Sequence, residues 1–306
     1  MSIAVASETS CIREHNVMAA PGLKGKVVIV TGAGSGLGEA MALGLARGGA
    51  SVLGLDVAGD RAQETARQAK AAGSPGTVHA LACDVRSEGS CAAAVETARS
   101  KLGGLTGVVN CAGLGMAYLT PDAFAKPPRF WDADPQRWWD MMDVNVRGPF
   151  LLARAAMPHL AAQKWGRVVN VTTSFNTMLR GGNMPYGQSK AALEAASSSW
   201  SEDARDTGVT VNVLVPGGAA DTRLVPDDSP FDRAALIRPQ VMVAPICWLM
   251  SDDSDGVTGQ RFIGKLWDPA KPWSDAMKAA GAPIGWPALA EQAATGQPRP
   301  GGRSGI

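Results

Sequence analysis

The sequence predicts an α/β fold: a doubly wound parallel sheet of about seven strands with helices on both faces. From residue 26 to residue 262, short runs rich in β-branched residues alternate with longer alanine-rich runs. The short runs are apolar almost throughout, which is typical of strands covered on both sides. Repeated strand–helix units favour parallel strands joined by right-handed crossovers. A glycine-rich turn, TGAGSGLG, joins the first strand to the first helix.

The apolar runs predict strands at residues 26–31, 50–56, 77–84, 106–110, 166–173, 208–216 and 256–263. The amphipathic runs predict helices at 36–49, 60–73 and 87–104, and another that begins near Tyr186. We expect one doubly wound domain, residues 23–263, after a flexible N-terminal extension, residues 1–22. Residues 264–306, rich in Pro, Gly and Trp with a helical piece at 274–281, are predicted to form a lid or an interface.

Composition excludes several classes of protein. A net charge of +1 without basic clusters argues against a nucleic-acid partner, and no apolar run is long enough to span a membrane. The 5 cysteines and 3 histidines lack metal-ligand spacing. We therefore expect a reduced, cytoplasmic protein with no metal site.

The glycine-rich turn predicts a nucleotide cofactor. Glycines let the backbone turn tightly and approach a pyrophosphate at the start of a helix. The residues expected to bind it are Gly32, Ser35, Gly36, Leu37 and Gly38.

The second strand ends in Asp56, whose carboxylate would accept hydrogen bonds from the adenosine ribose and repel a 2′-phosphate. Ser35, where a basic residue would grip that phosphate, is neutral. Both residues favour NAD over NADP. The alternative is that Asp56 only caps the next turn.

Tyr186 and Lys190 are four residues apart at the start of a predicted helix, so their side chains share one face. A tyrosine titrates near pH 10, and a nearby ammonium is expected to lower that pKa. The pair suits proton transfer by general acid–base catalysis.

With these motifs the chain resembles the short-chain dehydrogenase/reductase (SDR) family, in its short TGxxxGxG and YxxxK form with a Rossmann fold. The resemblance covers residues 24–262 and also rests on CDV, NCAG, DVNVRG and PG. It implies that Tyr186 is the acid/base, Lys190 binds the nicotinamide ribose, and Asn145 holds a water in the proton relay. It adds cofactor-binding roles for Asp84, Val85, Asn110, Ala112, Gly113, Pro216, Gly217 and Thr222, although Cys111 replaces an asparagine of the family motif and Thr222 falls one residue late.

Members of this family carry a serine commonly thirteen residues before the tyrosine. In this chain that position is Thr173, and Ser174 follows it. Threonine has the donor and acceptor capacity of serine, with an added methyl group. Either Thr173 or Ser174 is therefore expected to steady the substrate oxygen.

The long loop at 114–136 and the segment after residue 174 bring many apolar side chains to the expected site. These side chains predict a pocket for an aromatic or alicyclic substrate, or alternatively pack the loop onto the body: Met116, Tyr118, Phe124, Phe130, Trp131, Phe175, Met178 and Met184. Trp138 and Trp139 are expected to be buried helix residues. Arg223 and Arg261 are candidates for binding an acidic substrate group, although pairing at the surface is the commoner role of arginine.

Together these features predict an NAD-dependent oxidoreductase that interconverts a secondary alcohol and a ketone. The alternatives are a dinucleotide-binding sensor or scaffold without turnover, and a reductase of C=N or C=C bonds. The partner is expected to be a small molecule. The small residues on the Tyr186 helix fit the family's habit of forming homodimers or homotetramers.

Overall fold

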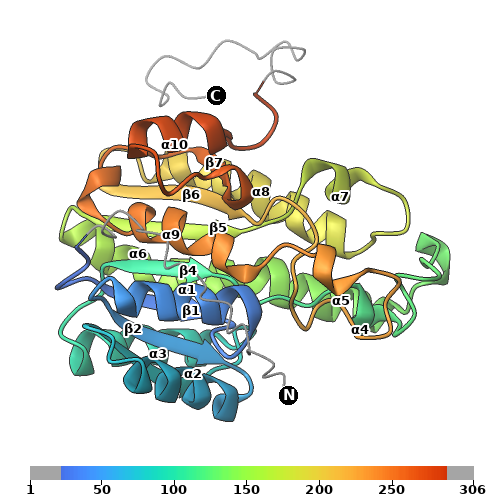
Figure 1. Ribbon diagram of the computed structural model, residues 1–306, viewed down its shortest axis with the longest axis horizontal. Helices are drawn as coiled ribbons and strands as arrows, with labels where there is room; N and C mark the ends of the chain where they lie inside the picture. Colours follow the sequence, from blue (N-terminus) through green and yellow to red (C-terminus); the bar gives the residue numbers. More distant parts are fainter. Residues whose placement is uncertain (1–21, 288–306) are drawn as a thin grey trace, which may run out of the picture.

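The computed structural model describes residues 22–287, and Figure 1 shows them as one sheet with helices on both sides. The sheet has eight strands in the order β3-β2-β1-β4-β5-β6-β7-β8. They are β1 (Val27–Thr31), β2 (Ser51–Asp56), β3 (Thr77–Ala82), β4 (Gly107–Asn110), β5 (Gly166–Val171), β6 (Val209–Val215), β7 (Gln260–Ile263) and β8 (Gly281–Pro283). The predicted extension at 1–22 lies almost wholly outside the described residues, as do residues 288–306.

The first seven strands run parallel, as predicted, and β8 adds one short strand at the edge of the sheet. β8 comes from the C-terminal segment and pairs antiparallel with β7, so that Arg261 lies opposite Ala282. Its three residues, Gly-Ala-Pro, have low strand propensity, and the sequence pattern therefore did not indicate a strand.

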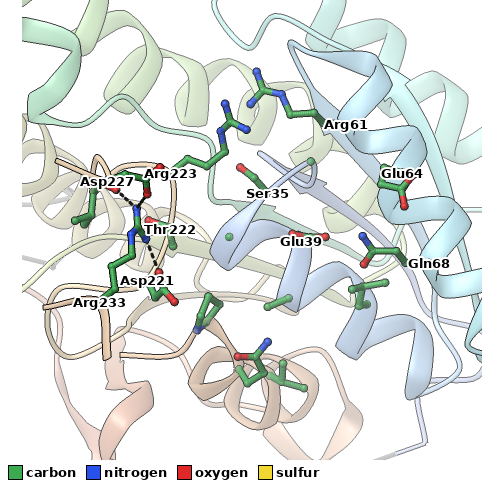
Figure 2. Close-up of a pocket in the computed structure, with 18 of the residues that line it drawn as sticks. Ser35, Glu39, Arg61, Glu64, Gln68, Asp221, Thr222, Arg223, Asp227 and Arg233 are labelled. Carbon is green, nitrogen blue, oxygen red and sulfur yellow. Dashed lines mark hydrogen bonds and ion pairs between the residues drawn. The ribbon is translucent and has the colours of Figure 1, made fainter. Parts of the chain in front are cut away.

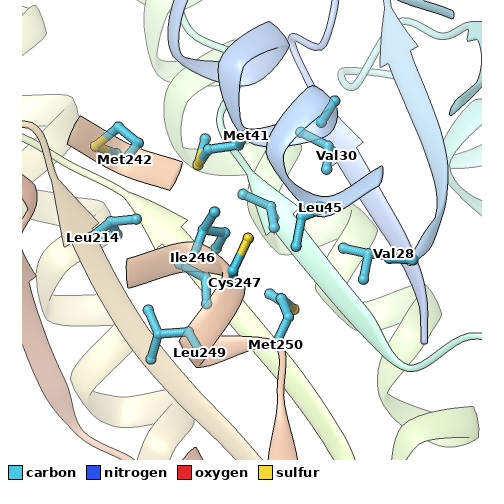
Figure 3. Packing of buried hydrophobic residues seen from close by; sticks show 14 of the residues in the cluster. Val28, Val30, Met41, Leu45, Leu214, Met242, Ile246, Cys247, Leu249 and Met250 are labelled. Carbon is cyan, nitrogen blue, oxygen red and sulfur yellow. The ribbon is translucent and has the colours of Figure 1, made fainter. Parts of the chain in front are cut away.

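The helices are α1 (Gly36–Arg47), α2 (Gly59–Ala71), α3 (Glu88–Lys101), α4 (Met116–Leu119), α5 (Pro135–Met142), α6 (Gly148–Ala162), α7 (Phe175–Leu179), α8 (Tyr186–Asp203), α9 (Val243–Leu249) and α10 (Trp273–Ala280). One core contains side chains of α1, α9 and α10 against one face of the sheet. Figure 3 shows the part of this core between α1 and α9. The other contains side chains of α3 and α6 against the opposite face. Both faces are covered, which explains the continuous apolar strands.

The described part of the C-terminal segment packs on the domain. Trp267 and Ala276 are buried in the core beside Phe262 of β7, and the rings of Trp248 and Trp267 lie 5.1 Å apart. The predicted helical piece at 274–281 corresponds to α10. The domain boundaries and the role of the segment as lid or interface stay predictions.

Among residues 22–287, none of the helices combines the length and apolar character needed to cross a membrane. Within this part of the chain, no three His, Cys, Asp or Glu side chains converge as metal ligands would.

Candidate active site

The glycine turn between β1 and α1 has the shape that a phosphate group needs. Gly32 and Gly36 have φ of +67° and +58°, and a residue with a side chain would be strained in this backbone conformation. A Cβ on Gly38 would lie 2.1 Å from the carbonyl oxygen of Gly32, so only glycine fits there. The backbone therefore forms a close cradle at the start of α1, which fits the pyrophosphate of a dinucleotide.

Thr31, which the sequence analysis did not single out, holds the neighbouring NCAG segment. Its Oγ1 accepts hydrogen bonds of 2.9 Å from the backbone N–H of both Cys111 and Ala112. Its position as the first residue of TGAGSGLG was the signal that could have identified it. Thr31 thus joins the glycine turn to the loop after β4.

A cleft of about 490 Å³ runs along the carboxyl ends of β1, β2, β3 and β4. Eleven of the predicted cofactor residues line it: Gly32, Ser35, Gly36, Leu37, Gly38, Asp56, Asp84, Val85, Ala112, Gly113 and Thr222. Asn110 instead lies below the cleft, where its Nδ2 donates to Asn170 Oδ1 at 2.8 Å. The PG segment borders β7, since the carbonyl of Pro216 accepts from Lys265 N–H at 3.1 Å and Gly217 abuts Ile263.

Asp56 is held rigidly at the end of β2. Its Oδ2 accepts from Gly34 N–H at 3.1 Å and its Oδ1 from Ala58 N–H at 2.9 Å. The carboxylate therefore does cap the local turns, the alternative role considered above. Each oxygen keeps a further lone pair, so the carboxylate can also accept a hydroxyl from the cleft.

Asp84 already has a partner. Arg86 donates to both of its oxygens, with the shortest contact 2.8 Å from Nη2, and this hydrogen bonding lowers the pKa of Asp84. At the end of β3 the cleft therefore carries a neutralised ion pair rather than a free carboxylate.

The structure brings Tyr186, Lys190 and Thr173 together at the carboxyl ends of β4 and β5. Lys190 is buried and its Nζ donates to the carbonyl of Val171 at 2.8 Å. Burial lowers the pKa of Lys190 to about 8. The side chain of Thr173, two residues beyond Val171, opposes part of the rise in the pKa of Tyr186.

The pKa of Tyr186 corrects the expectation that the lysine lowers it. Burial raises this pKa to about 12, and the side chain of Thr173 opposes the increase only in part. The physical reason is the apolar cover, because Tyr186 packs against the cluster of Met116, Leu119 and Ala123 from the 114–136 loop. In this desolvated place the phenolate is disfavoured.

The geometry separates the two candidate hydroxyls. Thr173 acts on the pKa of Tyr186, whereas Ser174 begins α7 and accepts from Thr177 N–H at 3.2 Å. A second bond of 2.9 Å joins the hydroxyls of Ser174 and Thr177. Ser174 is therefore committed to capping a helix.

Asn145 lies on a π-turn, Asp143–Arg147, between α5 and α6. Pro149 has no N–H to offer the carbonyl of Asn145, which explains why the α-helical pattern is interrupted there. The side chain of Asn145 is fully buried, and its two ends bind the backbone of Leu114. Its Nδ2 also donates to Ser189 Oγ at 2.9 Å. The amide thus ties the loop after β4 to α8, beside Lys190.

The aromatic residues of the 114–136 loop divide into two groups. Phe124 joins the cluster around Tyr186 and meets Phe231 edge-on, with ring centroids 5.5 Å apart. Phe130 and Trp131 are 71% and 62% exposed and do not enclose the site. Trp139 was predicted to be buried but is 60% exposed, because it falls on the outer side of the short helix α5.

A second hollow, about 960 Å³, adjoins the cleft across the glycine turn (Figure 2). Arg61 and Arg223 line both spaces, and their side chains extend toward one another above Ser35 in this view. Arg233, by contrast, is paired with Asp221 at 2.5 Å and Asp227 at 2.6 Å. No local spacing predicts that the two arginines meet, because Arg61 belongs to α2 and Arg223 to the loop after β6.

The fold and the site define a dinucleotide-binding oxidoreductase of the doubly wound class. Residues 26–231 match the family model described as short chain dehydrogenase. The chain belongs to the short-chain dehydrogenase/reductase family.

Three relatives illustrate the likeness. The 3-oxoacyl-(acyl-carrier-protein) reductase FabG of Pseudomonas aeruginosa is 30% identical over 246 residues, 78% of this chain and 94% of that protein. The 2,5-dichloro-2,5-cyclohexadiene-1,4-diol dehydrogenase LinX of Sphingobium indicum is 31% identical over 245 residues, 78% and 93% of the two chains. The crystal structure of a 3-ketoacyl-(acyl-carrier-protein) reductase from Brucella melitensis complexed with NADH matches with a TM-score of 0.65 and 28% identity, over 77% of this chain and 95% of that one.

Proposed function

We propose that this protein is an NAD-dependent oxidoreductase that interconverts a secondary alcohol and a ketone on an apolar aromatic or alicyclic substrate. The observation that carries the proposal is the buried Lys190 beside the end of β5, one helical turn after Tyr186: its ammonium donates to the carbonyl of Val171, two residues before Thr173. These are an acid/base, an oxygen-binding donor and a cation in one place.

In the direction of oxidation, Tyr186 takes the proton of the substrate hydroxyl as that oxygen becomes a carbonyl. Thr173 donates a hydrogen bond to the same oxygen, and the hydride leaves the carbon. NAD, when bound, supplies the acceptor for this hydride. Lys190 lies buried one helical turn after Tyr186 and is held by the carbonyl of Val171, and Asn145 holds the loop and α8 in register. General acid–base catalysis of this kind contributes roughly 10²- to 10⁴-fold in rate.

The preference for NAD rests on Asp56. Its carboxylate is fixed by two backbone N–H groups and lines the cleft at the end of β2. A second negative group, such as a 2′-phosphate, would be repelled there. Arg61 on the same wall is the feature that works in the opposite direction.

The apolar substrate class rests on the surroundings of Tyr186. Tyr186 packs against the buried cluster of Met116, Leu119 and Ala123, so a substrate that reaches it meets apolar side chains. The names of the relatives are compatible with this class, since one oxidises a cyclic diol and another reduces a ketone.

The test follows NADH absorbance as the purified protein meets NAD⁺ and a panel of aryl, alicyclic and aliphatic secondary alcohols. Wild type should form NADH with the aryl or alicyclic members, faster than with NADP⁺. The Tyr186→Phe variant should bind NADH with unchanged affinity and turn over at least about 100-fold more slowly.

Three results would redirect the proposal. Retained turnover in Tyr186→Phe removes the assigned acid/base. Tight NADH binding without turnover on the panel favours a sensor or scaffold. NADH consumption with imines or activated alkenes, but not with ketones, favours the reductase of C=N or C=C bonds.

A further inference from the structure

A buried ion pair lies behind the candidate site and has no part in the chemistry described above. Glu194 of α8 and Arg261 of β7 are joined by a 3.0 Å contact between Nε and Oε1, and their side chains are 0% and 5% exposed. Arg261 is therefore closed to an acidic substrate group, contrary to one expectation from the sequence. Tyr186, Lys190 and Glu194 follow one another at intervals of four residues along one face of α8.

The ion pair makes hydrogen bonds to the two residues that follow β5, Thr172 and Thr173. Thr172 Oγ1 donates to Glu194 Oε2 at 2.7 Å. Arg261 Nη2 donates to the carbonyl of Thr173 at 2.5 Å. Thr173 lies beyond the last strand residue, Val171, so this guanidinium gives its carbonyl a partner outside the sheet ladder.

The contacts continue to the next residues on both sides. The guanidinium carbon of Arg261 lies 4.3 Å from the ring centroid of Phe175, the first residue of α7. The ring of Trp286 lies 5.6 Å from the same phenylalanine, and Gly285 N–H points to Glu194 Oε1 at 3.4 Å. The C-terminal segment, through β8 and the residues after it, thus covers the pair and keeps water away.

Stability alone does not account for such a pair. Desolvating two charges costs about as much as their attraction returns, and apolar replacements of the same volume are often equally stable. A buried pair instead restricts geometry, because its charge-assisted hydrogen bonds form only when the groups they join are correctly oriented.

We propose that the Glu194–Arg261 ion pair is a positioning element that fixes Thr172 and Thr173 at the end of β5, and so sets where the Thr173 hydroxyl lies relative to Tyr186. The proposal rests on the proposed function for the roles of Thr173 and Tyr186. It assigns the described C-terminal segment a part in catalysis without contact with the substrate.

A spectroscopic test needs no turnover. The chain has only 2 tyrosines, so protein labelled with ¹³C at tyrosine Cζ gives two resonances, which the Tyr118→Phe variant assigns. Thr173→Val removes the hydroxyl and should move the Tyr186 resonance. The double variant Glu194→Gln with Arg261→Gln, which leaves no unpaired charge, should move it in the same direction.

The matched control lies at the other end of β5. Arg167 and Asp255 form an ion pair there, the arginine side chain is 2% exposed, and its guanidinium lies 4.0 Å from the ring centroid of Trp165. The double variant Arg167→Gln with Asp255→Asn should leave the Tyr186 resonance in place, even where it lowers the melting temperature. If the Glu194/Arg261 double variant does not fold, Thr172→Val breaks only the bond to Glu194 and should give a smaller displacement of the same sign.

Kinetics give the second readout. In the Glu194/Arg261 double variant, kcat should fall roughly 10- to 100-fold, because small displacements of a catalytic group have such effects. The affinity for NADH should be unchanged, and the rise of kcat with pH should move to higher pH, as in Thr173→Val. The Arg167/Asp255 control should keep the wild-type pH profile.

The results separate the two proposals. An unmoved Tyr186 resonance in the folded Glu194/Arg261 double variant overturns the positioning role, as does an equal displacement in the control. A Tyr186 resonance that is indifferent to Thr173→Val also overturns it. If the resonances move as expected while no substrate is turned over, the positioning stands and the proposed function fails.

Discussion

Asn145 and Leu114 exchange two hydrogen bonds: Asn145 Oδ1 accepts from Leu114 N–H at 2.8 Å, and Asn145 Nδ2 donates to the Leu114 carbonyl at 3.0 Å. Both ends of the side-chain amide are thus used on one residue of the loop after β4, and Nδ2 gives its second hydrogen to Ser189 Oγ. Asn145 therefore acts like a neighbouring strand for that loop.

Replacing Asn145 with alanine should lower the free energy of unfolding by about 1–3 kcal/mol, because both backbone groups of Leu114 lose their partner. Urea denaturation measures this change. Asn145→Asp, which keeps an acceptor for Leu114 N–H, should lose less. Equal stability of wild type and Asn145→Ala would contradict the anchoring role.

The two neighbouring hydroxyls should respond differently to their removal. Thr173→Val keeps the shape and removes the hydroxyl, so kcat/KM should fall by about 10- to 1000-fold at unchanged NADH affinity. Ser174→Ala should cost about 1 kcal/mol of stability as a lost helix cap, with little change in kcat/KM. Steady-state kinetics on the best panel substrate, with urea unfolding beside it, measures both. A larger kinetic loss in Ser174→Ala would reverse the assignment.

Gly36→Ala should weaken NADH binding at least about tenfold. Its φ of +58° strains an alanine, and the new Cβ would lie 2.8 Å from Thr222 Cγ2 beside the cofactor cradle. Gly73 is the matched control, because it has a φ of +62° but open space around it. Gly73→Ala should cost stability alone. Fluorescence titration with NADH compares the two variants, and equal affinities would show that the cradle tolerates a side chain.

The two buried groups of the site should shape the dependence of stability on pH. Lys190 has its pKa lowered from 10.5 to about 8, so between these values the unfolded chain binds a proton that the folded chain lacks. The free energy of unfolding should therefore rise across this window, by at most about 1.4 kcal/mol per pH unit. Tyr186 has its pKa raised from 10.0 to about 12, so its contribution is complete below pH 10 and is lost as the pH rises toward 12.

Urea unfolding of wild type and Lys190→Met at about pH 7.5, 8.5 and 9.5 isolates the lysine. The variant should lack the rise. Lys24→Met, which changes an exposed lysine, should keep it. A wild-type slope in Lys190→Met would mean that the ammonium is not desolvated in solution.

Asp56→Ser should shift the choice of cofactor. The variant keeps an oxygen for Gly34 N–H but removes the negative charge, and Arg61 then dominates that wall of the cleft. The Kd for NAD⁺ should rise about tenfold and the Kd for NADP⁺ should fall, as isothermal titration would report. Adding Arg61→Gln should reverse the gain for NADP⁺. An unchanged preference would place the selection elsewhere.

Much of this molecule could be predicted from the sequence, because its patterns are local. Apolar runs predicted seven strands, and glycine spacing predicted the turn whose φ values only glycine tolerates. Counting back from Tyr186 indicated Thr173, although only the structure shows that Ser174 is used as a helix cap.

What could not be predicted depends on contacts between distant residues. Glu194 and Arg261 are 67 residues apart, and no local spacing indicates that they meet. The raised pKa of Tyr186 follows from the packing of Met116 and Leu119, which a motif does not contain. The exposure of Trp139 shows the same limit, since a short helix has too few turns to reveal its outer side.

The strand β8 also decides how this side of the sheet can meet other molecules. Without β8, β7 would be an edge strand with unpaired backbone groups, and a strand of a neighbouring chain could pair with it and extend the sheet. β8 pairs with those groups of β7. It is itself a poor edge for further pairing, because it has three residues and its last, Pro283, has no backbone N–H. At this edge we expect no second chain to add a strand to the sheet. The predicted homodimer or homotetramer would then use other surfaces, such as helix faces.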